Sequence, residues 1–207
     1  KLFRLVDVIV LNNGETPLKE VLETISASKD SFLDLKNVNQ VIYLFDNKVK
    51  DNNRKETIPN THPNDLPRPD FEGIFLDLED EKGVFWTPRP VISLYTQRGC
   101  PFVETGCEFC AIPSGNNVRG SALARSPKMV AEDIEFFQKK YQTAYFSFGN
   151  ETLGKFYLQR LCDELEKRKI EATIDGYTRT DTFYTNEKRI DMDFIKQIAK
   201  YFRFLQI

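Results

Sequence analysis

The amino-acid sequence predicts an α/β protein, on the basis of three observations. After about residue 90, short apolar runs alternate with segments of helical periodicity, which is the pattern of parallel βαβ construction. A separate strand and helix are predicted near the start of the chain, and a polar, proline-rich stretch divides the two parts. With 207 residues, the chain has room for one large domain or for one and a half ordinary ones.

The first predicted elements are a strand and a helix. Val6–Leu11 is a short apolar run, which predicts a buried strand. The turn Asn12–Gly14 leads into a helix that starts near Thr16, with Pro17 at its first helical position. The apolar residues of this helix recur at helical spacing: Leu18, Val21, Leu22 and Ile25.

A hairpin and a linker follow this strand and helix. Residues 40–45 and the residues after Asp46 and Asn47 predict a β-hairpin. Residues 50–70 are polar and contain Pro59, Pro63, Pro67 and Pro69, which is typical of a linker. We therefore expect an N-terminal part over residues 1–58, a linker over residues 59–88 and a C-terminal part over residues 89–207.

The C-terminal part predicts three strands, each followed by a helix. The strands are Val91–Tyr95, Thr143–Phe148 and Ala172–Tyr177, and the helices begin at Ser126-Pro127, near Thr152 and after a capping Asp191. The apolar faces are Met129, Val130, Ile134 and Phe137 in the first helix, Leu153, Phe156, Tyr157, Leu161 and Leu165 in the second, and Phe194, Ile195, Ile198 and Phe202 in the third. Residues 203–207 predict the start of a fourth strand, with an extension of the third helix as the alternative. Because this set of strands does not close a sheet, we expect the chain to be a fragment of a longer polypeptide.

The composition narrows the class of protein. A formal net charge of −2 argues against a primary nucleic-acid binder, which needs a concentrated basic face. No apolar run approaches the roughly 20 residues that span a bilayer, and the first eleven residues do not resemble a secretory signal. We therefore expect a soluble, cytoplasmic protein in a reducing compartment, with no membrane and no clear nucleic-acid surface.

Three of the four cysteines are clustered, and this indicates a metal centre. Cys100, Cys107 and Cys110 form the pattern C-x6-C-x2-C, and the chain has a single histidine, His62, which lies in the linker. Structural zinc takes four protein ligands, whereas a [4Fe–4S] cluster held by three thiolates leaves one iron open to a small molecule. Zinc and a redox pair of cysteines are the alternatives. Cys162 lies within the second predicted helix, which is typical of a small buried hydrophobe.

With these residues placed, the chain resembles the radical S-adenosylmethionine (SAM) superfamily, and in particular its cobalamin-binding branch. That superfamily most often spaces its cysteines C-x3-C-x2-C on the loop after the first barrel strand, with an aromatic residue before the last cysteine. Phe109 occupies the aromatic position, and the first spacer is three residues longer here. The resemblance implies that Cys100, Cys107 and Cys110 bind a [4Fe–4S] cluster.

Two further segments resemble motifs of the same family. Gly149-Asn150-Glu151-Thr152 follows the second strand and is similar to the glycine–glycine–glutamate–proline motif beside the amino group of the cosubstrate. Arg179 ends the third strand and resembles an arginine that pairs with the cosubstrate carboxylate. The resemblance therefore implies that Phe109, Gly149, Asn150, Glu151 and Arg179 lie at the SAM site. A helix-capping turn at residues 149–152 and a surface arginine at position 179 are the alternatives.

The flanking segments carry the resemblance to the cobalamin-binding branch. Val6–Pro17 resembles the last strand and helix of a cobalamin-binding domain, and Asp65–Phe71 resembles the segment that joins that domain to the barrel. The implied fold is the C-terminal remnant of a Rossmann-like cobalamin-binding domain, followed by the first half of a radical SAM partial (β/α) barrel. The Asp-x-His-x-x-Gly cobalamin motif does not occur in the sequence, so cobalamin is expected only of the full-length protein.

The function implied by the resemblance is a radical SAM enzyme, represented by an incomplete fragment. Its cluster would cleave S-adenosylmethionine reductively and start radical chemistry on an unidentified small-molecule or peptide substrate. The implied electron donor is a protein such as flavodoxin or ferredoxin. The alternatives are a non-catalytic module that binds zinc or an iron–sulfur cluster, and an electron carrier that has no use for Glu151 and Arg179.

Overall fold

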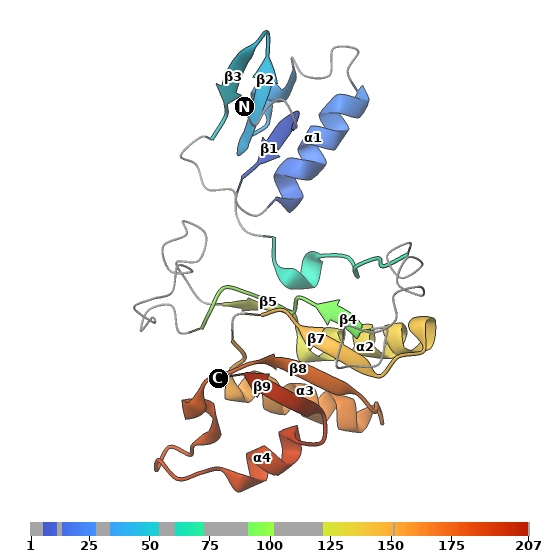
Figure 1. Cartoon of the computed structure of the whole chain (residues 1–207), viewed down its shortest axis with the longest axis vertical. Helices are drawn as coiled ribbons and strands as arrows, with labels where there is room; N and C mark the ends of the chain where they lie inside the picture. Colours follow the sequence, from blue (N-terminus) through green and yellow to red (C-terminus); the bar gives the residue numbers. More distant parts are fainter. Residues whose placement is uncertain are drawn as a thin grey trace, which may run out of the picture. The chain divides into compact units, whose positions relative to one another are not determined.

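The structure is a computed structural model in which the chain forms two compact units. It describes residues 6–11, 14–27, 34–53, 61–72, 91–101, 122–150 and 152–206. The first unit is Lys1–Thr61 and the second is His62–Ile207. The two units are described separately below (Figure 1).

The first unit contains a three-stranded antiparallel sheet and one helix. The strands are β1 (Val8–Val10), β2 (Val41–Phe45) and β3 (Lys48–Asp51), in the order β1-β2-β3, and the helix is α1 (Glu15–Ala27). The expected strand, helix and hairpin are therefore all present. The strand residues of β1 are half-buried rather than buried. On α1, Val21 is buried, but Leu18 and Leu22 are 48% and 57% exposed.

The hairpin between β2 and β3 follows from its turn residues. Asp46 and Asn47 both have positive φ values, 50° and 58°. Two consecutive left-handed residues twist the chain in the sense that joins antiparallel strands, and aspartate and asparagine tolerate this conformation better than most residues. The β2–β3 register, Phe45 opposite Lys48, places these two residues at the tip.

The second unit is built on a four-stranded parallel sheet. Its strands are β4 (Val91–Leu94), β7 (Tyr145–Phe148), β8 (Thr173–Tyr177) and β9 (Phe202–Gln206), in the spatial order β4-β7-β8-β9. The connections contain the helices α2 (Pro127–Tyr141), α3 (Lys155–Lys167) and α4 (Met192–Ile198). The predicted α/β class and the parallel alternation are thus confirmed. The fourth strand is also confirmed, so the alternative of a longer third helix is wrong.

The helix boundaries follow from capping residues. The Ser126 hydroxyl accepts a hydrogen bond from the Met129 amide at 3.3 Å, and the Asp191 carboxylate accepts one from the Phe194 amide at 3.0 Å. Both residues are therefore the N-caps that their positions before an apolar periodic segment predict. The α2 helix ends where Gln142 adopts a left-handed conformation. No helix in the described part of the chain is long and apolar enough to span a bilayer.

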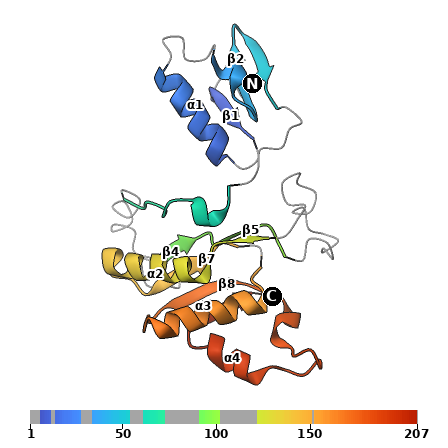
Figure 2. The ribbon, with the colours of Figure 1, turned by 180° about the vertical axis from the view of Figure 1, so that it is seen from behind.

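The three α-helices described in the second unit, α2, α3 and α4, lie on one face of its sheet. Ion pairs and hydrogen bonds join neighbouring helices: Arg168 at the end of α3 pairs with Glu132 and Glu135 of α2, and Gln197 of α4 donates to Asp163 of α3. The opposite views in Figure 1 and Figure 2 show the sheet in front of the helices and then the helices in front of the sheet. Strand order that follows chain order, with every helix on the same face, results when each crossover has the same hand.

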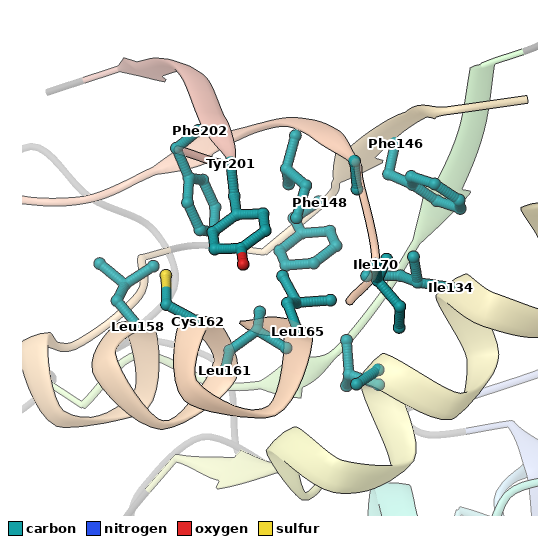
Figure 3. Close-up of a cluster of buried hydrophobic side chains, with 14 of the residues drawn as sticks. Ile134, Phe146, Phe148, Leu158, Leu161, Cys162, Leu165, Ile170, Tyr201 and Phe202 are labelled. Atoms are coloured by element: carbon teal, nitrogen blue, oxygen red, sulfur yellow. The ribbon is translucent and has the colours of Figure 1, made fainter. Parts of the chain in front are cut away.

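Apolar residues at alternate strand positions pack against these helices. The buried strand residues are Ile92, Leu94, Phe146, Phe148 and Ile174, and the α3 residues that meet the sheet are Leu158, Leu161, Cys162 and Leu165 (Figure 3). The rings of Phe148 and Phe202 meet edge to face with centroids 6.0 Å apart. Such alternate burial is the period-2 pattern of a sheet with one apolar face.

One core prediction and one element assignment for the second unit are wrong. Phe156 was expected on the buried face of α3, but it is 81% exposed. It precedes the buried Leu158 by two positions, which is a rotation of about 200° around a helix. Phe202 is buried as expected, but it lies in β9 and not in the third helix. The α4 helix is only seven residues long, so its apolar periodicity ends at Ile198.

Residues 62–72, part of the expected linker, pack against α2 within the second unit. Arg125 donates to the backbone carbonyls of Pro63 and Leu66 at 2.6 and 3.1 Å. The Phe71 ring lies edge-on to Phe137, with centroids 5.3 Å apart. This segment is therefore held by specific contacts in spite of its high proline content.

Candidate functional site

The predicted site residues that the structure describes follow the carboxyl ends of neighbouring parallel strands. Cys100 lies beyond the end of β4, Gly149 and Asn150 directly follow β7, and Arg179 lies two residues after β8. The strands β4, β7 and β8 are adjacent and parallel, so these residues lie at one edge of the sheet. Ligands of parallel α/β sheets bind at this edge.

Cys100 lies at the start of segment 99–122, which we call the cysteine loop, and the residues that flank this segment are paired with each other. The short strands β5 (Gln97–Arg98) and β6 (Leu123–Ala124) form an antiparallel pair, and the Arg125 amide donates to the Thr96 carbonyl at 2.7 Å. Gly99 has a φ of 74°, a left-handed conformation that a side chain would strain. Cys100 follows it and is partly exposed. The base of the loop thus presents the first predicted ligand at the sheet edge.

Asn150 joins the end of β7 to the start of this loop. Its Oδ1 accepts a hydrogen bond from the Thr96 amide at 2.9 Å, and its Nδ2 donates to Thr96 Oγ1 at 2.6 Å. Both residues are buried. In the structure, the Asn150 amide group therefore binds protein backbone and side chain at the position that the resemblance assigns to a cosubstrate contact.

Among the described residues, nothing crowds Gly149 at the end of β7. A Cβ atom added there would lie 3.9 Å from both Ser93 Oγ and Tyr95 Cδ2, which is an ordinary contact distance. The described residues therefore leave room for a small side chain at this position. Glycine lets a bound molecule approach the backbone more closely than alanine would.

Arg179 pairs with a neighbouring carboxylate. Its Nε and Nη2 donate to Asp181 at 3.1 and 3.0 Å, and this hydrogen bonding holds the pKa of the Asp181 carboxyl below its usual value. The Arg179 side chain is 38% exposed. A ligand carboxylate would compete with Asp181 for the Arg179 guanidinium. The pairing with Asp181 therefore weakens the binding of an anion at Arg179.

One buried hydroxyl at this edge has no hydrogen-bond partner among the described residues. Thr152 is 6% exposed, and its Oγ1 is unpaired in the part of the chain that the structure describes. Buried polar groups nearly always have a partner in the protein, in ordered water or in a ligand. This residue occupies the fourth position of the segment that resembles the cosubstrate motif.

Sequence reasoning missed a row of polar residues on the sheet face that points away from the described helices. Ser93, Ser147 and Asp175 lie opposite one another in neighbouring strands, on the face that does not contact the helices. A parallel sheet that is covered on both faces has nearly continuous apolar strands. The alternation of polar and apolar residues within these strands was the signal for a polar face.

Four of the predicted site residues lie outside the described residues: Cys107, Phe109, Cys110 and Glu151. Among the residues that are described, no three His, Cys, Asp or Glu side chains lie close enough to hold a metal ion. Only one of the three predicted ligands, Cys100, belongs to that part of the chain. The other thiol described, Cys162, is buried in the α3 core, far along the chain from the loop.

Comparisons with known proteins add no relative. No protein-family model matches the chain, and no curated protein sequence matches it significantly. A functional assignment therefore depends on the residues of this chain and on their arrangement.

Proposed function

We propose that this chain is part of a radical SAM enzyme in which Cys100, Cys107 and Cys110 bind a [4Fe–4S] cluster. The observation that carries the proposal is the placement of the described motif residues. The segments that lead to Cys100, Gly149-Asn150 and Arg179 follow three adjacent parallel strands, although they are far apart in sequence. An assembly of three separate motifs at one sheet edge supports a ligand site better than any motif alone.

The arrangement of the second unit favours a partial (β/α) barrel over a doubly wound sheet. In a barrel, each strand pairs with the next along the chain and all helices lie outside. A doubly wound sheet reverses its strand order and carries helices on both faces. The order β4-β7-β8-β9, with its helices on one face, agrees with the first pattern. The polar row Ser93–Ser147–Asp175 would then face the interior of the barrel.

The described residues fit a polar ligand beside the cysteine loop. Cys100 is partly exposed, Gly149 leaves the strand end open, and the buried Thr152 hydroxyl has no partner among the described residues. When bound, a three-thiolate cluster supplies the electron for reductive cleavage of S-adenosylmethionine. The chain would contribute the three thiolates, with Phe109 beside the last.

The remaining motif residues would orient the cosubstrate. The Glu151 carboxylate would accept a hydrogen bond from its ammonium group, and the Arg179 guanidinium would pair with its carboxylate. Gly149 would allow close approach of the backbone. These contacts distinguish an enzyme from an electron carrier, which needs the cysteines alone.

Anaerobic reconstitution with iron and sulfide tests the cluster. We expect about four irons per chain and a broad charge-transfer absorption, both lost in Cys100→Ala, Cys107→Ala and Cys110→Ala. Cys162→Ala is the matched control and should retain both, because Cys162 is a core residue of α3. A colourless protein with one zinc would indicate a structural metal module instead.

Titration with S-adenosylmethionine tests the cosubstrate site. The electron paramagnetic resonance (EPR) spectrum of the reduced cluster should change on titration. Glu151→Gln should weaken the apparent affinity by about 10–100-fold, because a charge-assisted hydrogen bond contributes roughly 1.5–3 kcal/mol. A cluster whose spectrum never responds to S-adenosylmethionine would support the electron carrier.

A further inference from the structure

A buried hydrogen-bond network holds the backbone that leads to Cys100. Asn150 at the end of β7 contributes both halves of its amide group to Thr96, one to the backbone N–H and one to the hydroxyl. Asn150 is 4% exposed and Thr96 is 1% exposed, so water does not replace these bonds. Two parts of the chain that are 54 residues apart are thereby joined at the sheet edge.

Gln97 extends the network to the residue that precedes Cys100. Its Nε2 donates to the Gly99 carbonyl at 2.9 Å and to the Thr152 carbonyl at 2.8 Å. Gln97 is 3% exposed. A single side-chain amide therefore connects the left-handed glycine before the cysteine with the segment that follows β7.

The far end of the cysteine loop is fixed at the same place. The β5–β6 pair brings Arg98 opposite Leu123, and the Tyr157 hydroxyl of α3 donates to the Arg125 carbonyl at 2.9 Å. Burial raises the pKa of Tyr157 to about 12, so this hydroxyl keeps its proton and remains a donor. Both ends of segment 99–122 are therefore anchored to the sheet and to α3.

We propose that Asn150 and Gln97 are positioning residues that hold the backbone of Cys100 in place for cluster binding. The inference rests on the proposed function. It extends that function, because the resemblance places Asn150 at the SAM site, whereas here Asn150 holds the backbone beside the cluster. Metal binding must order its ligands, and fixing one residue of a flexible chain has an entropic cost. Because the backbone is already fixed up to Gly99 in the metal-free chain, part of this entropic cost is absent when the cluster binds.

The donors and acceptors of the network give opposite expectations for two conservative variants. Thr96 donates its N–H to Asn150 Oδ1 and accepts from Asn150 Nδ2 at its hydroxyl. Because a hydroxyl can donate as well as accept, it can turn its proton toward an aspartate at position 150, whose two oxygens would then accept from both Thr96 groups. Asn150→Asp should therefore preserve the anchor that Asn150→Ala removes. Gln97 faces two carbonyl oxygens, so Gln97→Glu would place a carboxylate against acceptors and should fail like Gln97→Ala.

The test combines a measurement on the metal-free chain with one on the reconstituted chain. Amide hydrogen exchange at Thr96 should accelerate in Asn150→Ala and return to the wild-type rate in Asn150→Asp. The cluster should be lost to an iron chelator roughly 10–100-fold faster in Asn150→Ala, Gln97→Ala and Gln97→Glu, and at the wild-type rate in Asn150→Asp. Asn52→Ala is the matched control, because Asn52 also donates to two carbonyls, those of Leu35 and Val38 in the first unit.

The outcomes distinguish a failure of the proposed function from a failure of the positioning role. If wild type binds no cluster, the proposed function fails, and the inference fails with it. If wild type binds a cluster that Asn150→Ala and Gln97→Ala retain for as long, the inference alone is overturned. Equal loss in Asn52→Ala would also overturn it, since the effect would then reflect general destabilisation. Urea unfolding of each variant identifies any that fails to fold, and Thr96→Val then serves as a milder second variant, because it removes the hydroxyl and keeps the amide bond to Asn150.

Discussion

A buried carboxylate on α2 gives the sharpest prediction about stability. The Asp133 side chain is 4% exposed and accepts hydrogen bonds from Arg125 Nε at 2.8 Å and from Arg68 Nε at 2.7 Å. Arg125 is 10% exposed at its side chain and also holds the carbonyls of Pro63 and Leu66. One carboxylate thus pairs with two guanidinium groups that attach residues 62–72 to the helix.

Asp133→Asn keeps the shape of the side chain and removes its charge. Removal of one partner of a buried ion pair costs about 3–5 kcal/mol, because the remaining charge stays out of water. Arg68 is 36% exposed at its side chain and can reach solvent, so we expect the lower end, about 3 kcal/mol. For a domain of this size, that loss lowers the melting temperature by about 6–12 °C.

Urea unfolding followed by circular dichroism measures this change. Arg125→Met should destabilise more than Arg68→Met, since Arg125 is the more buried and makes more bonds. Glu135→Gln is the control: it lies two residues further along α2, and its ion pairs are at the surface, where charge pairs contribute little. A loss of less than about 1 kcal/mol in Asp133→Asn would refute the reasoning, because it would place this cluster among ordinary surface pairs.

Three further predictions concern the core and the helix ends of the second unit. Burial raises the pKa of the Cys162 thiol from its usual 9.0 to about 12, so its thiolate fraction falls by roughly 1,000-fold; native alkylation at pH 8, read by mass spectrometry, should spare it, and rapid labelling would contradict its burial. Leu161→Ala should cost about 2–5 kcal/mol in urea unfolding and Phe156→Ala much less, whereas equal losses would mean that α3 presents a different face. The Lys155 ammonium, by its hydrogen bond, holds the pKa of Asp191 below its usual 3.8, so the bond stabilises the fold above that value and is lost as the pH falls through the lowered pKa. The stability difference between wild type and Asp191→Asn should accordingly be present at about pH 6 and shrink below about pH 4; a constant difference would point to the cap alone.

Much of the secondary structure was predictable, because its determinants are local. Ser126 before Pro127, and Asp191 before an apolar segment, are short-range signals for a helix start, and both are N-caps in the structure. The paired turn residues Asp46 and Asn47 are an equally local signal for a hairpin. The alternation of predicted strands with predicted helices likewise identified the parallel sheet.

The rest depends on contacts between distant residues. Phe156 was misplaced because α3 starts at Lys155 rather than near Thr152, and because the choice between two apolar stripes is made by the sheet beneath the helix. An aspartate such as Asp133 is usually exposed, and its burial here is explained by its ion pairs with Arg68 and Arg125. The bond between Asn150 and Thr96 joins separate strands and leaves no periodic signal. The cluster and cosubstrate assignments remain predictions.

The paired base of the cysteine loop has a consequence for how this segment can change in evolution. Because β5 and β6 close the loop at residues 98 and 123, a change of length inside it does not alter the connection from β4 to α2. Loop-closure entropy grows only logarithmically with length, so three additional residues in a loop of this size cost about 0.1 kcal/mol. Insertions or deletions of about three residues between Cys100 and Cys107 should therefore change the stability of the second unit very little.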